Sequence, residues 1–187
     1  PAFMSWELAC LNGACDSVQE AFWHPMPTFE LYDLMTDPQE LHNLASQSQY
    51  AQVLNAMKKA LLEQLYKGPD LGFFPKNMRQ RGSEIPFYEL VRTQNINVKA
   101  VIDAAAFASQ VEAQDLPKLE LMVKDSQAAV RYWAAMGLNR LIHLEMIDTL
   151  SSLVYEAWDQ ANEEPEVRLM LAEALVNDGQ NCEPLSY

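Results

Sequence analysis

The segment VRYWAAMGL, from Val130 to Leu138, decides how the second half of this chain folds, because it returns in altered form as VRLMLAEAL from Val167 to Leu175. The offset is 37 residues, and four residues recur at the same places: Val130/Val167, Arg131/Arg168, Ala135/Ala172 and Leu138/Leu175. A fainter copy, VKAVIDAAA, begins at Val98. Helical segments that recur at periods of roughly 30 to 47 residues are typical of an α-solenoid.

The sequence around these copies predicts further helices with short polar breaks between them. The predicted helices cover 87–92, 97–109, 115–123, 126–142, 145–160 and 164–177. Small residues, among them Gly137 and Ala174, allow neighbouring helices to approach closely. The alternative is a chance likeness between two amphipathic helices, but three copies, each preceded by another helix, favour the repeat.

The first half of the chain is organised differently. Residues 48–66 form a strongly amphipathic helix, with apolar residues at spacings of three and four: Tyr50, Val53, Leu54, Met57, Leu61, Leu62 and Leu65. Residues 5–23 predict two short helical turns, and 29–34 predict one strand. A loop at 67–82, with Phe73 and Phe74 exposed, links the two parts. We therefore expect a mainly α fold with two domains, 1–82 and 83–187.

Composition excludes several classes of function. The chain has 187 residues, 49% of them apolar, and a formal net charge of −13. Nucleic-acid binding needs clustered Lys and Arg, so we expect no nucleic-acid partner. No apolar run reaches the roughly 20 residues of a membrane span, and no signal peptide is recognisable, so we expect no membrane partner either.

Cysteine and histidine residues give no metal or catalytic motif. The three cysteines, Cys10, Cys15 and Cys182, lack any Cys-x-x-Cys spacing. A Cys10–Cys15 bridge is conceivable in an oxidising compartment, but free cysteines are the favoured interpretation. The three histidines are scattered, and no Ser/His/Asp arrangement can be argued from the sequence. We expect no metal site, no cofactor and no catalytic residue in this chain.

The segment TFELYDLMTDPQELHNLA, from Thr28 to Ala45, carries the most specific resemblance. It closely resembles the C-terminal signature of the type I sulfatase family, in bacterial members of the heparan N-sulfatase-like branch. The matching residues are Glu30, Leu31, Tyr32, Asp33, Leu34, Asp37, Pro38, Glu40, Asn43, Leu44 and Ala45. The flanking LNGACDSVQEAFWHPMP and DLGFFP also resemble this branch, some members of which carry helical repeats after the sulfatase domain.

The resemblance implies a fold for residues 1–82. In sulfatases the signature strand belongs to a small antiparallel sheet beside the catalytic domain, and a following helix covers it. Asp33 and Asn43 would then cap turns and helix ends. The partner strands would come from upstream of Pro1, so strand 29–34 is expected to be unpaired, or to pair with another copy of the chain in a homo-oligomer.

The resemblance also implies what the intact enzyme does and where its chemistry lies. Sulfatases use a Cys-x-Pro-x-Arg or Ser-x-Pro-x-Arg motif, whose first residue becomes formylglycine, and hold Ca²⁺ or a similar cation. Neither motif nor ligands occur here, so this chain alone is expected not to hydrolyse sulfate. In the parent enzyme, His24 is the candidate contact to a sulfated sugar. Met26 and Phe29 depart from the family pattern nearby, which weakens that assignment.

Residues Asp125 to Leu138 resemble a HEAT repeat. In that motif Val130, Ala135 and Leu138 are core, Asp125 caps the second helix, and Arg131 ties neighbouring repeats through an acidic or carbonyl partner. The copy at Val167, Arg168, Ala172 and Leu175 would repeat these roles.

Two functions follow from these observations. The first is a non-catalytic C-terminal fragment of a sulfatase that hydrolyses sulfate esters or N-sulfates of carbohydrates, joined in cis to an upstream catalytic domain. The second is a free-standing helical-repeat interaction module, with Phe73, Phe74, Tyr132 or Trp133 as anchors, although core packing is favoured for Trp133. The sulfatase resemblance implies a periplasmic or secreted location.

Overall fold

A computed structural model describes residues 2–24, 26–68, 70–80, 85–161 and 164–178. The described chain is mainly helical, as the sequence predicts, and divides into two compact units: unit 1 ends at Leu61 and unit 2 begins at Leu62. This boundary falls before the predicted one at residue 82. No helix among the described residues is both long enough and apolar enough to cross a membrane.

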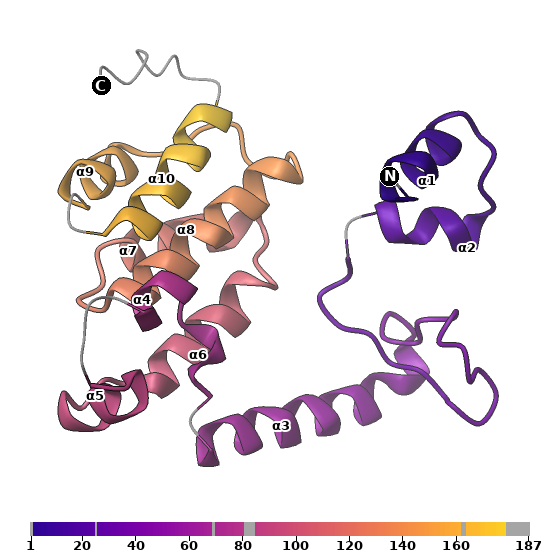
Figure 1. The fold of residues 1–187 in the computed structure, drawn as a ribbon, viewed down its shortest axis with the longest axis horizontal. Coiled ribbons are helices and arrows are strands. Elements are labelled where there is room, and N and C mark those ends of the chain that lie inside the picture. Colours follow the sequence, from indigo (N-terminus) through magenta and orange to yellow (C-terminus); the bar gives the residue numbers. More distant parts are fainter. Residues whose placement is uncertain (1, 25, 69, 81–84, 162–163, 179–187) are drawn as a thin grey trace. The chain divides into compact units, whose positions relative to one another are not determined.

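Unit 1 contains short helices and a long loop (Figure 1). Its elements are α1 (Ala2–Leu11), α2 (Ser17–Glu20), the 3-10 helices η1 (Ala21–Trp23) and η2 (Ser48–Tyr50), and the first part of α3 (Ala51–Lys67), whose last turns belong to unit 2. Asp16 begins α2 by accepting hydrogen bonds from the backbone N–H groups of Val18 and Gln19. The predicted helix at 48–66 is confirmed as η2 followed by α3.

The predicted strand at 29–34 is wrong, since no strand occurs among the described residues of the chain. The segment is extended, but its backbone pairs with the loop of residues 43–45 rather than with another strand. The C=O of Phe29 and both backbone groups of Leu31 thus have partners without a sheet. The predicted pairing of this segment with another copy of the chain stays a prediction.

Unit 2 contains the remaining helices. They are η3 (Leu71–Phe73), α4 (Lys76–Gln80), α5 (Phe87–Thr93), α6 (Val98–Ala108), η4 (Ala113–Asp115), α7 (Leu116–Met122), α8 (Ala128–His143), α9 (Ser152–Gln160) and α10 (Pro165–Asn177). Five of the six predicted helical blocks agree with these bounds within a few residues. The block at 145–160 begins later, at Ser152, because the chain turns after α8 with Glu145 at φ 54°.

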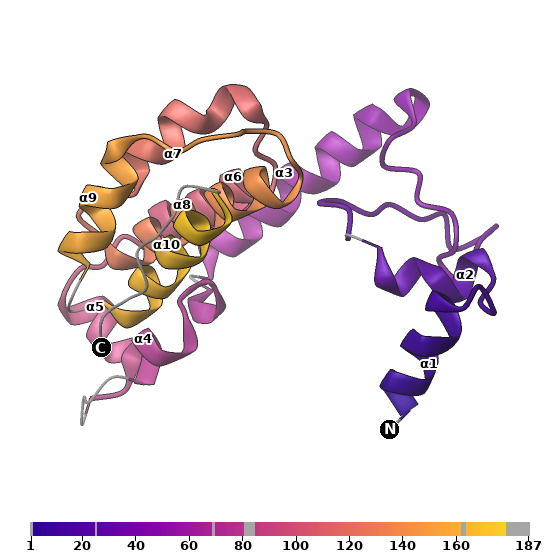
Figure 2. The same ribbon diagram turned by 90° about the horizontal axis from the view of Figure 1, so that it is seen from above.

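The three copies of the repeated segment become α6, α8 and α10, which form one row. Helix α8 packs against both of its neighbours in the row. Figure 2 shows α7 and α9 on one side of this row, as a second layer. Each repeated helix follows another helix in the chain: α5 precedes α6, α7 precedes α8, and α9 precedes α10.

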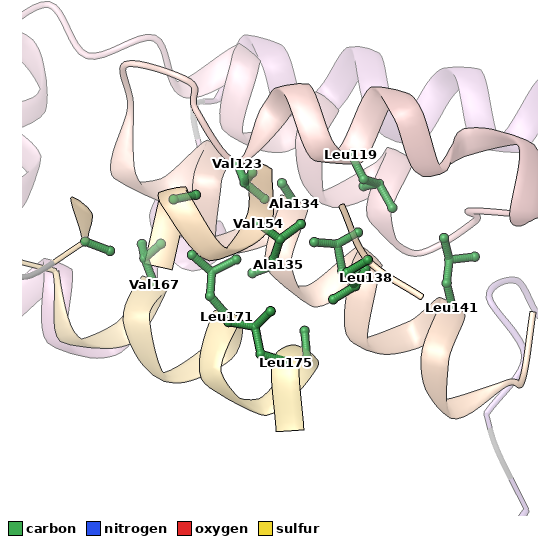
Figure 3. Packing of buried hydrophobic residues seen from close by; sticks show 14 of the residues in the cluster. Leu119, Val123, Ala134, Ala135, Leu138, Leu141, Val154, Val167, Leu171 and Leu175 are labelled. Atoms are coloured by element: carbon green, nitrogen blue, oxygen red, sulfur yellow. The ribbon is translucent and has the colours of Figure 1, made fainter. Parts of the chain in front are cut away.

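Two apolar clusters hold unit 2 together. In the larger cluster, side chains from α7, α8, α9 and α10 converge (Figure 3), with Leu119, Leu138, Val154 and Leu171 fully buried. Gly137 of α8 lies against α7: a Cβ built there would come within 2.7 Å of a methyl group of Leu119. Glycine therefore allows the close approach of these two helices.

The smaller cluster covers the α6 end of the row. It gathers α5, α6, η3 and the last turns of α3 around Phe74 and Ile102. The prediction that Phe73 and Phe74 are exposed is wrong: Phe74 is buried, and Phe73 packs against this cluster. The indole N–H of Trp133 donates to the carbonyl of Phe73 over 2.8 Å, which ties α8 to η3. Much of the predicted linker at 67–82 is therefore part of unit 2.

Candidate functional site

The loop at residues 29–45, here called the signature loop, is braced by one side chain. Asn43 accepts hydrogen bonds at Oδ1 from the N–H groups of Leu31 (3.0 Å) and Ala45 (2.9 Å), and its Nδ2 donates to the carbonyl of Phe29 (3.1 Å). The N–H of Leu44 donates to the carbonyl of Leu31 over 2.8 Å. These bonds give the extended segment the partners that a neighbouring strand would otherwise supply. The Asn43 amide is half-buried and bonded at both ends, so it fixes the loop closely.

Two aspartates shape the turns that follow. Asp33 accepts from the N–H groups of Met35 through its side chain and of Asp37 through its carbonyl. The carboxylate of Asp37 accepts from the N–H groups of Leu41 (3.1 Å) and His42 (2.8 Å). The hydrogen bond from His42 is the main reason that the pKa of Asp37 is lowered. Residues 37–41 form a turn, not a helix that starts at Pro38.

The signature loop carries aromatic and acidic side chains, and a lysine of α3 lies against it. Lys58 of α3 lies over the ring of Phe29, 3.7 Å from its centre. Burial raises the pKa of Tyr32, and the carboxylates of Glu30 and Glu40 raise it further. The phenol therefore stays protonated at neutral pH. Leu34 is exposed on this loop.

A disulfide and four aromatic rings precede the loop. Cys10 and Cys15 are joined, so the favoured expectation of free cysteines is wrong for this pair; Cys182 lies outside the described residues. The rings of Phe3, Trp6, Phe22 and Trp23 gather beside them, with Trp6 and Phe22 centred 4.9 Å apart. The disulfide and the rings together join α1 to α2 and η1.

His24 follows this aromatic cluster and is exposed. Its backbone N–H donates to the carbonyl of Ala21. Neither observation tests a role for His24 in sugar binding, so that role stays a prediction. Across the described residues, no three His, Cys, Asp or Glu side chains lie close enough together to hold a metal ion.

In unit 2, Arg131 joins two neighbouring helices of the row, α8 and α10. Its guanidinium pairs with the carboxylate of Glu164, which directly precedes α10, and donates to the carbonyl of Asp125 before α8. The Asp125 side chain accepts from the N–H of Gln127, the residue at the start of α8. A pocket of about 210 Å³ opens beside Arg131 and Glu164.

The other residues predicted to be structural in the repeats are mostly in the core. Val130, Ala135, Leu138, Val167 and Leu175 are buried. Ala172 is half-buried, and Arg168 lies over the ring of Trp158 at 4.9 Å. The corresponding arginines Arg131 and Arg168 therefore have different partners.

The geometry thus defines a helical protein with a loop braced by the side chains of Asn43, Asp33 and Asp37. Residues 20–67 match the family model for N-sulphoglucosamine sulphohydrolase, C-terminal. This match contains the whole signature loop and α3, and it supports a sulfatase C-terminal region in the first part of the chain. Searches of curated proteins and of solved structures gave no match.

Proposed function

We propose that the chain is a non-catalytic part of a sulfatase, whose catalytic domain lies upstream and whose helical repeats stabilise the enzyme or mediate an interaction. The observation that carries this proposal is the match of residues 20–67 to the C-terminal region of a sulphohydrolase. The intact enzyme would hydrolyse sulfate esters or N-sulfates of carbohydrates. The HEAT-like character of unit 2 is part of the same proposal.

The surface of unit 1 supports an upstream partner. None of its described residues is buried, although many are large and apolar. Helix α1 has apolar residues on all sides, and Phe3, Met4, Leu8 and Leu11 are all more than half exposed. A helix that is apolar all round is normally enclosed by protein. A catalytic domain packed over unit 1 would bury these side chains.

The chemistry of the proposed enzyme belongs to that upstream domain. Formylglycine would supply the nucleophile and Ca²⁺ would bind the sulfate group. The described residues of this chain offer no set of ligands for the cation, so no step is assigned to them. The exposed His24 is our candidate for a contact to the sulfated sugar in the intact enzyme.

The Cys10–Cys15 disulfide supports a periplasmic or secreted location. Disulfides persist in oxidising compartments and are rare where thiol reductants act. The sulfatases that the signature loop resembles are commonly exported as well. The two arguments are independent, because one rests on a bond and the other on the family.

The test is to read the gene upstream of the codon for Pro1 and to assay the encoded protein. We expect the reading frame to continue and to encode a Cys-x-Pro-x-Arg or Ser-x-Pro-x-Arg motif. The complete protein should then release sulfate from an N-sulfated or O-sulfated saccharide, while residues 1–187 alone should not. A start codon and ribosome-binding site directly before Met4 would overturn the proposal.

A second candidate is a free-standing interaction module. The specific observation in its favour is that unit 2 has its own two-cluster core, which does not involve unit 1. Residues 62–187 expressed alone should then fold cooperatively. This candidate predicts that the chain functions without any upstream domain, and the gene sequence distinguishes it from the first.

A further inference from the structure

The signature loop presents three large apolar side chains to solvent. Leu34 is 59% exposed, Met35 is 92% exposed and Leu41 is 48% exposed. Leu34 and Met35 lie in a hydrogen-bonded turn, in which the N–H groups of Met35 and Thr36 donate to the carboxylate and to the carbonyl of Asp33. The fold of the loop therefore holds these apolar side chains in water.

Carboxylates accompany this apolar surface, and no cation of the loop does. Residues 30–41 contain no Lys or Arg and four acidic residues: Glu30, Asp33, Asp37 and Glu40. The carboxylates of Glu30 and Glu40 both lie close enough to the phenol of Tyr32 to raise its pKa. Neither carboxylate forms an ion pair with a described Lys or Arg. Two negative charges on the loop are therefore left without a positive partner among the described residues.

The same imbalance of charge extends over the first part of the chain. Residues 1–57 contain seven acidic residues and no Lys or Arg, so all 13 basic residues of the chain lie at Lys58 or beyond. A surface with one sign of charge attracts a surface of the opposite sign and repels one of its own sign. Nucleic acids and anionic lipid surfaces would be repelled, and a second copy would bring its own carboxylates to the contact. Charge complementarity therefore calls for a partner surface that carries Lys and Arg.

We propose that the signature loop docks on a protein surface that has an apolar recess surrounded by Lys and Arg, and that this surface belongs to the upstream catalytic domain. The inference rests on the proposed function for the identity of that domain, and it adds the chemistry of the contact. Met35 enters the recess, where its flexible, unbranched side chain adapts to the available shape and leaves water. Glu30 and Glu40 pair with the surrounding basic side chains.

Methionine oxidation measures the contact directly. The complete protein and residues 1–187 are treated with hydrogen peroxide, and peptide mass spectrometry follows the sulfoxide formed at each methionine. We expect Met35 to oxidise at least about tenfold more slowly in the complete protein, because oxidation follows exposure. Met146 of unit 2, 42% exposed, is the internal control and should oxidise at the same rate in both proteins. Equal rates for Met35 in the two proteins would overturn the proposal.

Charge reversal tests the basic surroundings of the recess. In the complete protein, Glu30→Lys combined with Glu40→Lys should remove most of the protection of Met35, because like charges would then meet at the contact. The matched control, Glu89→Lys combined with Asp148→Lys, changes the net charge equally at two exposed carboxylates of unit 2 and should leave Met35 protected. Protection that survives the first pair of substitutions would show that the recess is not surrounded by cations, and the proposal would be wrong.

A milder pair of substitutions separates lost charge from lost structure. Glu30→Gln combined with Glu40→Gln removes the negative charges without adding positive ones, so it should speed the oxidation of Met35 by a smaller factor than the two lysines do. Circular dichroism of each variant of residues 1–187 should match that of the parent. An equal effect of glutamine and lysine would mean that charge does not decide the contact, and would overturn the proposal.

The outcomes distinguish this inference from the proposed function. If the upstream reading frame encodes no sulfatase nucleophile motif, the proposed function fails and the docking domain with it. If the complete protein releases sulfate but Met35 oxidises as fast as in residues 1–187, only the docking inference fails. If Met35 becomes protected in residues 1–187 alone as the protein concentration rises, a second copy covers the loop and the inference is wrong.

Discussion

The two units of this chain are stabilised by different kinds of interaction. Unit 2 has a packed apolar core, with leucines and valines fully removed from water. Unit 1 has no buried residue among those described and is held by a disulfide, a ring cluster and side chains bonded to backbone groups. The part with the clearest family match is therefore the part that depends least on its own core.

The largest effect should come from removing a core side chain of unit 2. Leu138→Ala leaves a cavity between α8 and its neighbours, and we expect it to lower the free energy of unfolding by about 2–5 kcal/mol. Leu8→Ala in α1 of unit 1 is the matched control, and it should change stability by no more than about 0.5 kcal/mol, because Leu8 is already exposed. Thermal unfolding followed by circular dichroism measures both. Equal losses would show that unit 1 is packed as tightly as unit 2.

The next effect should be confined to unit 1. Replacing Cys10 and Cys15 with serine opens the short loop between them, and the chain-entropy model gives a loss of about 2 kcal/mol for the local structure. Hydrogen exchange should speed up at the amides of α1 and α2. Exchange at the amides of α8 should not change, since the units have separate cores. Faster exchange in α8 would show that the two units are not stabilised separately.

A smaller effect should come from the ion pair within unit 2. The side chains of Arg131 and Glu164 are 19% and 22% exposed, and Arg131→Met leaves a partly buried carboxylate without its partner. We expect a loss of about 1–3 kcal/mol, part of which the double variant with Glu164→Gln recovers. Lys124→Met breaks the more exposed pair with Glu156 and should cost at most about 1 kcal/mol. Equal losses of unfolding free energy in urea would show that burial does not make the Arg131 pair contribute more than the Lys124 pair.

Most of unit 2 was predictable because its signals are periodic. Three copies of one pattern gave three helices in a row, and predicted bounds such as 126–142 lie close to the observed Ala128–His143. One difference between the copies was not predicted: Asn139 in α8 is buried, whereas Val176, the corresponding residue in α10, is exposed. The burial of Phe74 depended on distant helices, which a local pattern cannot reveal.

Unit 1 was harder to predict because its order depends on single side chains. The residues at 29–34 have the apolar and aromatic character of a strand, and only the amide of Asn43, twelve residues after Leu31, decides otherwise. The disulfide depended on whether the thiols are oxidised, which spacing alone does not tell. His24 is exposed, and none of its contacts with the described residues identifies its role. Side-chain bonds across a loop have no periodicity from which to infer them.

The smallest effect should be the acid opening of the turn at Asp37. The pKa of Asp37 is lowered in the folded loop, chiefly because the His42 N–H donates to its carboxylate. The carboxylate therefore stabilises the turn at pH values above the ordinary aspartate pKa of about 3.9, and this contribution is lost as the pH falls through the lower, folded value.

In a nuclear magnetic resonance titration, the amide signals of Leu41 and His42 should shift together below about pH 3.9. Asp37→Asn should abolish that inflection, while core amides of unit 2, such as that of Leu138, should show none in either protein. An inflection above the ordinary aspartate value would mean that burial outweighs the two hydrogen bonds, and that the turn is held by its surroundings rather than by its own side chain.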